Sequence, residues 1–263
     1  MIALVVVGGA GRMGRAIAEA AHGAGDLTVR ACVDPAAGAH APSPTSPAGD
    51  GPVWGSDLAT LVRPGDVVVE FSSPAGAVAT AKICAERGLP LVSGTTGLDA
   101  DAESGIRAAA TRVPVLRAAN FSIGVLALRR ALDAVLTALP GWDVEIVERH
   151  RRGKVDAPSG TALELARRAR AQRGWGEETV RNGRSGRTGP RPDAEIGLHS
   201  LRGGSWIGDH AVVFAGAGEW VELRHVAQDR GAFAHGVLRA ARFVAEAAPG
   251  LYTLDDVIET GDP

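Results

Sequence analysis

The hydrophobic positions of the first 120 residues alternate between two periods. Short apolar runs, long enough for strands buried on both faces, are separated by segments with helical spacing and helix-forming composition. This alternation predicts a Rossmann-like doubly wound parallel sheet and an α/β fold. The predicted strands are 2–7, 27–33, 66–71, 90–93 and 113–116, and the predicted helices are 13–21, 75–87 and 100–112.

The pattern changes after Asn120. Later strand-like runs are joined by short Gly-rich turns, which favours a mostly antiparallel sheet in an inserted α+β domain. The predicted domains are therefore residues 1–120 together with 230–263, and residues 121–229. Helices are expected at 123–139, 161–172 and 230–247, strands at 143–147, 196–201, 210–214 and 220–225, and exposed loops at 35–52 and 172–192.

Composition excludes several classes of protein. Hydrophobic residues make up 45% of the chain, and 28 basic residues face 30 acidic ones, so a broadly basic nucleic-acid surface is not expected. Neither an apolar run of membrane-spanning length nor an export signal is found, which predicts a soluble cytoplasmic protein. Cys32 and Cys84 lie in apolar segments without metal-ligand spacing, so buried thiols and no metal site are expected.

A glycine-rich turn follows the first predicted strand. Glycines in this place let a helix N-terminus approach a pyrophosphate, although a tight turn without a ligand has the same spacing. Asp34, at the end of the second strand, could accept hydrogen bonds from an adenosine ribose. This acid favours NADH over NADPH, while Arg12 could supply a cation for a 2′-phosphate. The candidate cofactor residues here are Gly8, Gly11, Arg12, Met13, Gly14 and Asp34.

The densest polar cluster spans residues 148–161. Pro158 and Ser159 favour a helix start, so Ser159, Gly160 and Thr161 should present amides and hydroxyls to a carboxylate or phosphate. Helix capping alone would explain the same residues, and basic loops are usually just solvated.

Two side chains of the cluster could move protons. His150 carries an imidazole that can give or accept a proton, and Lys154 is one of only two lysines in the chain. Together with a nicotinamide fold, the cluster indicates hydride transfer to an electron-poor carbon of an acidic substrate. The developing negative charge would be stabilised or protonated by His150 or Lys154.

These motifs, in this order, resemble the 4-hydroxy-tetrahydrodipicolinate reductase (dihydrodipicolinate reductase) family along nearly the whole chain. The most specific one is KVDAPSGTA at 154–162, with His150 four residues before its lysine. The glycine turn, GTTG at 94–97 and AANFS at 118–122 are also similar, as is the run from GDH at 208–210 through 218–219 to 233–234.

The resemblance implies reduction of the cyclic imine derived from 4-hydroxy-tetrahydrodipicolinate to tetrahydrodipicolinate with NADH or NADPH, in lysine and diaminopimelate biosynthesis. His150 would be the acid, Lys154 a second proton donor or substrate contact, and the segment 159–161 the carboxylate site. The inserted domain would bind substrate and build a homotetramer through its sheet. Residues implied on the nicotinamide side are Phe71, Gly94, Thr95, Thr96, Ala118, Asn120 and Phe121.

One position departs from the family pattern. Arg151 stands where members commonly have a second histidine that helps bind substrate. Its guanidinium could hold a carboxylate through a bidentate fork. Two alternatives follow from this sequence: a paralogous reductase of a related cyclic imine or imino acid, and a nicotinamide-binding sensor without turnover.

Overall fold

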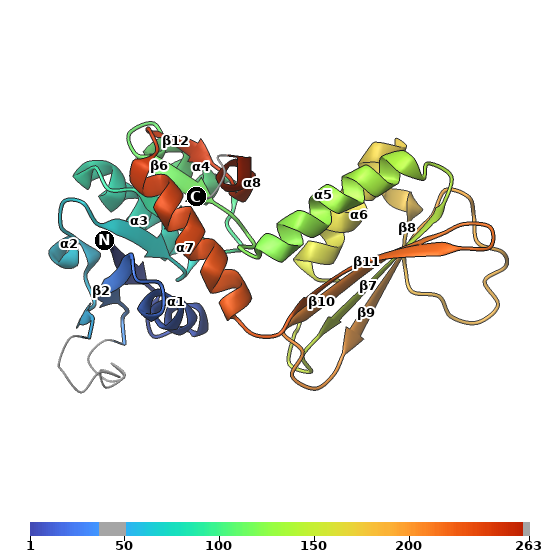
Figure 1. Ribbon diagram of the computed structural model, residues 1–263, viewed down its shortest axis with the longest axis horizontal. Helices are drawn as coiled ribbons and strands as arrows, with labels where there is room; N and C mark the ends of the chain where they lie inside the picture. Colours follow the sequence, from blue (N-terminus) through green and yellow to red (C-terminus); the bar gives the residue numbers. More distant parts are fainter. Residues whose placement is uncertain (37–50, 260–263) are drawn as a thin grey trace. The chain divides into compact units, whose positions relative to one another are not determined.

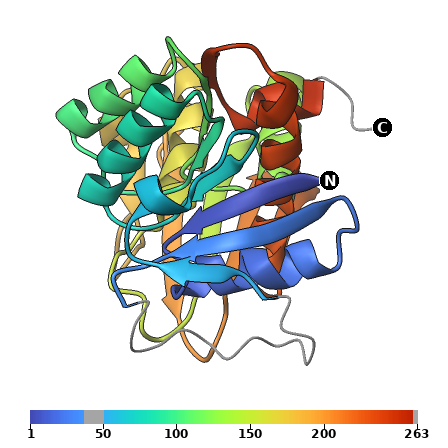
Figure 2. The same cartoon turned by 90° about the vertical axis from the view of Figure 1, so that its left-hand side faces the viewer.

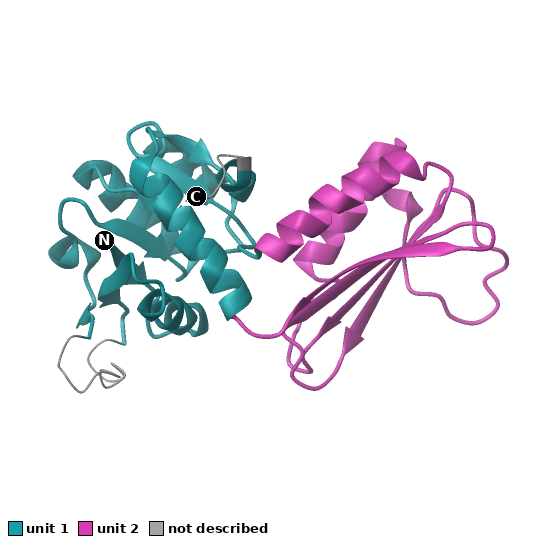
Figure 3. Ribbon diagram, in the orientation of Figure 1, with its two compact units in different colours: residues 1–122, 231–263 teal, residues 123–230 magenta. Residues whose placement is uncertain are grey.

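The chain forms two compact units in a computed structural model that describes residues 1–36 and 51–259. Unit 1 contains residues 1–122 and 231–263, and unit 2 contains residues 123–230 (Figure 3). The sequence pattern predicts boundaries at 120/121 and 229/230, whereas the units divide at 122/123 and 230/231. Most of the loop expected at 35–52 lies outside the described residues.

Unit 1 is built on a seven-stranded sheet in which every paired strand is parallel. Its order is β12-β6-β5-β4-β1-β2-β3 (Figures 1 and 2). From β1 the chain adds β2 and β3 on one side, and it then returns to β1 and adds β4, β5, β6 and β12 on the other side. The Rossmann-like prediction is confirmed. The strands are β1 (Ile2–Val7), β2 (Leu27–Val33), β3 (Val53–Gly55), β4 (Val67–Glu70), β5 (Leu91–Ser93), β6 (Pro114–Arg117) and β12 (Gly250–Tyr252).

Helices cover both faces of this sheet, because right-handed crossovers that run in opposite directions from β1 and β4 fall on opposite faces. One face carries α1 (Arg12–His22) with α7 (Gly231–Glu246), and the other carries α3 (Pro74–Arg87) with α4 (Ala100–Ala109). Two short helices complete the unit, α2 (Leu58–Leu61) and α8 (Leu254–Glu259). The sequence pattern missed the short elements β3, α2, β12 and α8, because three to six residues carry too little periodicity.

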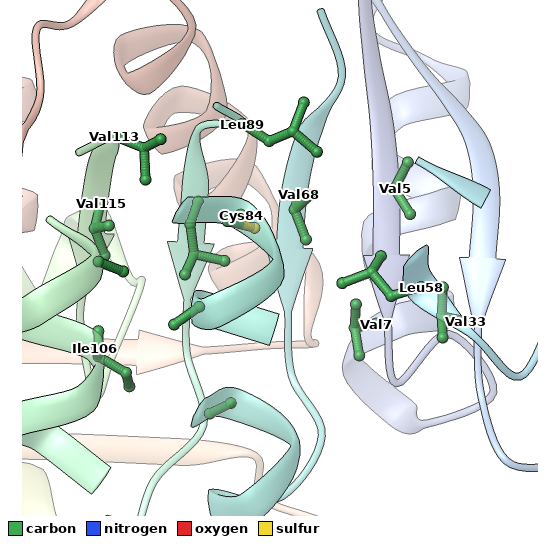
Figure 4. Packing of buried hydrophobic residues seen from close by; sticks show 14 of the residues in the cluster. Val5, Val7, Val33, Leu58, Val68, Cys84, Leu89, Ile106, Val113 and Val115 are labelled. Atoms are coloured by element: carbon green, nitrogen blue, oxygen red, sulfur yellow. The ribbon is translucent and has the colours of Figure 1, made fainter. Parts of the chain in front are cut away.

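The central strands are rich in valine and leucine because parallel strands covered on both faces meet little water. Val5, Val68 and Leu91 have no exposed surface and belong to one cluster with residues of the covering helices α3 and α4. Figure 4 labels Val5 and Val68 within this cluster. Cys84 lies in the same cluster, and both cysteines are buried free thiols as expected. Burial, and to a lesser extent the nearby negative charge of Glu70, raises the pKa of Cys84 to about 12. This thiol therefore stays protonated and inert.

Unit 2 packs two helices on one five-stranded sheet. The helices α5 (Ile123–Ala138) and α6 (Gly160–Arg173) contact each other, and a 3₁₀ turn spans Glu177–Thr179. The sheet order is β11-β10-β7-β9-β8. The strands are β7 (Asp143–His150), β8 (Val180–Asn182), β9 (Ile196–Arg202), β10 (Gly208–Ala215) and β11 (Trp220–Ala227).

The prediction of a mostly antiparallel sheet holds only for part of this sheet, which is mixed. β10 pairs antiparallel with β7 and β11, whereas β9 pairs parallel with β7 and β8. The chain leaves β7 and crosses through α6 before it forms β9, and such a crossover brings the next strand back in the same direction. Short turns between later strands gave no sign of this crossover.

Two local boundaries also differ from the sequence pattern. β7 continues through His150, so Glu148, Arg149 and His150 are strand residues rather than part of the polar loop. The loop expected at 172–192 contains β8, a three-residue strand at the sheet edge. In both places polar residues occupy strand positions, so hydrophobic periodicity could not reveal them.

Candidate active site

The turn after β1 in unit 1 requires glycine. Gly8 has φ +82°, and a Cβ on it would lie 2.2 Å from the Phe71 carbonyl oxygen. A Cβ on Gly14 would lie 2.5 Å from the Gly8 oxygen, and Gly11 is the N-cap of α1 without a side-chain cap. The turn therefore brings backbone amides at the start of α1 to the carboxyl edge of the sheet, an arrangement suited to a pyrophosphate.

Asp34 fixes this turn from the end of β2. Its Oδ2 accepts a hydrogen bond from the Ala10 amide (3.1 Å), and its Oδ1 accepts one from Ala36 (3.0 Å). The carboxylate is half-buried, and its two hydrogen bonds to main-chain amides fix its position. Arg12 is exposed at the first position of α1, and Met13 beside it is half-buried.

A second group of residues lies at the carboxyl ends of β4, β5 and β6. The Phe71 ring occupies the space beside Gly94, where a Cβ would lie 2.1 Å from its Cε1, and it contacts the Phe121 ring with centroids 5.4 Å apart. Asn120 Oδ1 accepts a hydrogen bond from the Ser122 amide (2.9 Å). Ala118 is half-buried, and Thr96 is exposed. Neighbouring parallel strands thus bring these predicted residues to the edge that carries the glycine turn.

Glu70 organises this second group from inside the sheet, and sequence reasoning missed it. It has no exposed surface, and its carboxylate accepts hydrogen bonds from the Ser72 amide (2.7 Å) and hydroxyl (2.6 Å). The hydroxyls of Thr95 (2.6 Å) and Ser93 (3.1 Å) also donate to it. A buried carboxylate must be satisfied, so Glu70 holds the loops after β4 and β5 in one arrangement.

In unit 2, His150 pairs with a buried carboxylate. Its Nδ1 lies 2.5 Å from Oε2 of Glu148, which has no exposed surface. Arg202 donates to both Glu148 oxygens (2.8 Å each), and the Ser159 amide donates to Oε1 (3.2 Å). Burial opposes ionisation of Glu148, but hydrogen bonds from Arg202, His150 and Ser200 outweigh it and hold its pKa at about 2.

His210 lies beside this pair on β10, directly opposite Glu148. Its Nε2 is 3.0 Å from the Ser159 hydroxyl, and its ring meets that of His150 edge-on, with centroids 5.2 Å apart. Within the described residues, its buried Nδ1 has no hydrogen-bond partner. Burial, together with repulsion from His150, lowers the pKa of His210 to about 4, so the ring is neutral at neutral pH.

The predicted anion site lies at the start of α6. Ser159 is the N-cap, and its hydroxyl accepts a hydrogen bond from the Ala162 amide (3.2 Å). Gly160 is exposed and Thr161 is half-buried in the first turn. Lys154 Nζ forms an ion pair with Asp156 (2.8 Å) and keeps 21% of its side chain exposed. The Arg151 amide donates to the Trp206 carbonyl (2.8 Å), which ties the loop after β7 to the β9–β10 connection.

The predicted residues thus fall into two groups, one in each unit. In unit 2, sequence reasoning missed the contributions of Glu148, Arg202 and His210. The spacing of Glu148 and His150, two apart on one strand, puts their side chains on the same face and could have indicated the pair. Arg202 and His210 come from β9 and β10, and no local pattern connects them with β7.

The strand order and the glycine turn together place the protein in the class of Rossmann-fold dinucleotide-dependent enzymes. Comparison with known families narrows this class. A family model described as "Dihydrodipicolinate reductase, N-terminus" matches residues 2–121, and one described as "Dihydrodipicolinate reductase, C-terminus" matches residues 124–258. The chain therefore belongs to the dihydrodipicolinate reductase family, as its motifs predict.

Individual relatives agree with this membership. The 4-hydroxy-tetrahydrodipicolinate reductase of Thermomicrobium roseum is 44% identical over 98% of this chain and 100% of its own. That of Myxococcus xanthus is 42% identical over 98% of each chain. A dipicolinate-bound dihydrodipicolinate reductase from Paenisporosarcina sp. TG-14 superposes with TM-score 0.78 at 26% identity, covering 98% of this chain and 100% of that one.

Two further findings concern other expectations. None of the helices formed by residues 1–36 and 51–259 is long and apolar enough to cross a membrane. Over the same residues, no group of three or more His, Cys, Asp or Glu side chains is arranged to hold a metal ion.

The lowered pKa of His210 predicts a specific pH dependence of stability. The unfolded chain takes up a proton on this histidine near its ordinary pKa of about 6.5, whereas the folded protein does so only near pH 4. The free energy of unfolding should therefore fall as pH decreases from about 6.5 to 4. In His210→Gln this part of the slope should disappear, as measured by urea unfolding at several pH values.

The control for this measurement is His22→Gln, at an exposed position at the end of α1. It should retain the wild-type slope. A His210→Gln variant whose unfolding free energy follows the wild-type pH dependence throughout this window would contradict the buried neutral histidine.

Proposed function

We propose that this protein reduces the cyclic imine derived from 4-hydroxy-tetrahydrodipicolinate to tetrahydrodipicolinate with NADH or NADPH, in lysine and diaminopimelate biosynthesis. The single observation that carries the proposal is the Glu148–His150 pair beside the N-terminus of α6. This pair places a candidate proton donor next to a candidate anion site. The chain is also 44% identical to a relative described as a 4-hydroxy-tetrahydrodipicolinate reductase. A cytoplasmic location stays a prediction, and it agrees with a need for reduced nicotinamide.

The glycine turn fits a nicotinamide dinucleotide. A Cβ on Gly8 or Gly14 would meet backbone at 2.2 and 2.5 Å, so only glycine allows the close approach that brings the N-terminus of α1 toward a pyrophosphate. Asp34 would accept hydrogen bonds from the ribose, and Arg12 would face a 2′-phosphate. Such a cofactor supplies the hydride. The acid favours NADH, because a 2′-phosphate beside a carboxylate is repelled.

The residues at the ends of β4, β5 and β6 would bind the nicotinamide half. Glu70 fixes the main chain of Ser72 and the hydroxyl of Thr95, and the Phe71 and Phe121 rings form an apolar surface beside them. The other residues that we assign to this side are Gly94, Thr96, Ala118 and Asn120.

In unit 2, the first turn of α6 would hold a substrate carboxylate. The amides of Gly160 and Thr161 and the hydroxyl of Thr161 lie at the positive end of the helix dipole. Lys154 and Arg151, both half-buried, would add fixed positive charge. The relative from Paenisporosarcina binds dipicolinate, a planar diacid, which agrees with an anion site of this kind.

His150 would act as the acid. Reduction of the imine leaves a negative charge that needs a proton, and the Nε2 of this ring is free of the hydrogen bond that engages Nδ1. Lys154 is the second candidate, because its Nζ pairs with the exposed Asp156 and can exchange that partner for substrate.

A coupled assay tests the activity. Dihydrodipicolinate synthase would generate the unstable substrate in place, while absorbance follows the oxidation of NADH and, separately, NADPH. We expect turnover with both, and a higher kcat/KM with NADH because Asp34 faces the ribose. Absence of turnover while NADH still binds would overturn the proposal and favour a paralogue whose substrate is altered by Arg151; a cofactor ratio in favour of NADPH would contradict the role of Asp34.

The two lysines of the chain provide a matched pair for the role of Lys154. Lys154→Ala should lower kcat/KM by more than about a hundredfold, because one charge-assisted contact in a dry site contributes about 3 kcal/mol. Lys82 is 77% exposed on α3, so Lys82→Ala should leave kcat/KM unchanged. A loss of less than roughly tenfold in Lys154→Ala would rule out the assigned role.

We also propose that the protein is a homotetramer built through the sheet of unit 2. Trp220 and Val226 lie on one face of the edge strand β11 and are 64% and 51% exposed. Large apolar side chains at such positions are typical of buried interfaces.

Sedimentation equilibrium tests this assembly. The wild type should have four times the 27.0 kDa mass of one chain, and Trp220→Glu with Val226→Glu should dissociate it, because each carboxylate would lose its hydration. Leu163→Glu, at a 50% exposed position on α6, is the control. A double variant of undiminished mass would contradict this interface, and a monomeric wild type would contradict the assembly.

A further inference from the structure

We propose that Glu148 is a positioning residue for proton delivery: it fixes the hydrogen of His150 on Nδ1, so that Nε2 is the nitrogen that exchanges protons, and it ties this ring to the anion site at Ser159. The inference rests on the proposed function, in which His150 is the acid. Glu148 itself is enclosed in the protein and would touch neither substrate nor cofactor.

The first observation is the alignment of the two side chains. Glu148 and His150 are two residues apart on β7, so both point to the face of the sheet that carries α5 and α6. Oε2 of Glu148 lies 2.5 Å from Nδ1 of His150, and only 12% of the His150 side chain is exposed. The ring therefore has one orientation, with a carboxylate behind it.

The second observation is what keeps Glu148 ionised although it is buried. Arg202 binds both of its oxygens at 2.8 Å and also donates to the Asp156 carbonyl (2.7 Å), so the guanidinium is itself held from two sides. Burial opposes the charge on Glu148, yet these bonds keep its pKa at about 2. Near neutral pH, Glu148 is therefore a carboxylate with a fixed position.

A carboxylate without a proton can only accept hydrogen bonds. Nδ1 must therefore carry the hydrogen in the neutral ring, which leaves the lone pair on Nε2 and makes Nε2 the nitrogen that gains and loses the catalytic proton. The strand opposite leaves space beside Nε2, because Gly208 has no side chain, whereas a Cβ on it would contact this nitrogen at 3.4 Å.

The third observation connects the acid with the anion site. The amide of Ser159, the N-cap of α6, donates to Oε1 of Glu148 (3.2 Å). The two oxygens of one carboxylate thus fix both the imidazole and the residue that begins the anion site. A substrate carboxylate at the start of α6 would then lie at a set distance from the proton on His150.

The charges around His150 give the expected effect of removing this carboxylate. Facing the ring are Glu148 from the same strand, Arg202 from β9, and from β10 His210, which is neutral at neutral pH. In Glu148→Gln the positive charge of Arg202 is no longer balanced, so the protonated imidazole becomes less favourable. The amide can also present its N–H to Nδ1, which favours the wrong tautomer.

The experiment compares Glu148→Gln with the wild type in the coupled assay as a function of pH. We expect kcat to fall by about a hundredfold, the size of one general acid-base contribution. The alkaline limb of the plot of kcat against pH should move to lower pH. The KM for NADH should stay within about twofold, because Glu148 makes no contact with the cofactor. Wild-type kcat with a wild-type pH profile in Glu148→Gln would overturn the proposal.

Glu145→Gln is the matched control. Glu145 is on the same strand and also contacts a histidine, His199 (2.7 Å), and an arginine, Arg184. Burial opposes its ionisation, but hydrogen bonds from these two side chains hold its pKa at about 2. It lies on the opposite face of the sheet, so its loss should leave kcat and its pH profile unchanged. A wild type without turnover would contradict the proposed function, whereas an active wild type with a fully active Glu148→Gln would contradict only the positioning role.

A second measurement depends neither on activity nor on the ability of Glu148→Gln to fold. Nitrogen-15 chemical shifts of the wild type, with His150 assigned by comparison with His150→Gln, distinguish the two neutral tautomers. The hydrogen of the neutral ring should be on Nδ1. A neutral ring with its hydrogen on Nε2 would overturn the proposal.

Discussion

The burial of one carboxylate determines the arrangement of the candidate catalytic residues in unit 2. Glu148 has no exposed surface, and an isolated charge in such a place would cost several kcal/mol. Arg202, His150 and the Ser159 amide together offset that cost. Removing one partner of a buried pair typically costs about 3–5 kcal/mol, so the partners cannot move independently. The requirement to satisfy one charge thus brings together residues from β7, β9 and α6.

Unit 1 uses a buried carboxylate in a different way. Glu70 is surrounded by hydroxyls and an amide rather than by a cation. Its partners lie at the last residue of β5 and in the segments after β4 and β5, so the hydrogen bonds order the backbone at this edge of the sheet. Glu148 holds the side chain of the candidate acid His150, whereas Glu70 holds the loops on which candidate cofactor residues stand.

The dinucleotide part of the site depends on close approach of backbone. At Gly8 and Gly14 the space for a Cβ is filled by carbonyl oxygens, and at Gly94 it is filled by the Phe71 ring. Glycine is needed here because another chain segment occupies the position of its side chain, which is a property of the assembled sheet. The glycine spacing was visible in the sequence, but the reason for each glycine was not.

The sequence by itself determined the elements that have a strong period and the residues that stand in local motifs. The buried runs 2–7 and 27–33 predicted β1 and β2 with their bounds, and the segment 154–162 was recognisable because its order is contiguous. Only the tertiary structure decided the mixed pairing of the second sheet, the extension of β7 to His150, and the partners of Glu148. Arg202 and His210 are 54 and 62 residues from Glu148 along the chain, and β-sheet pairing, which no local pattern records, places them beside it.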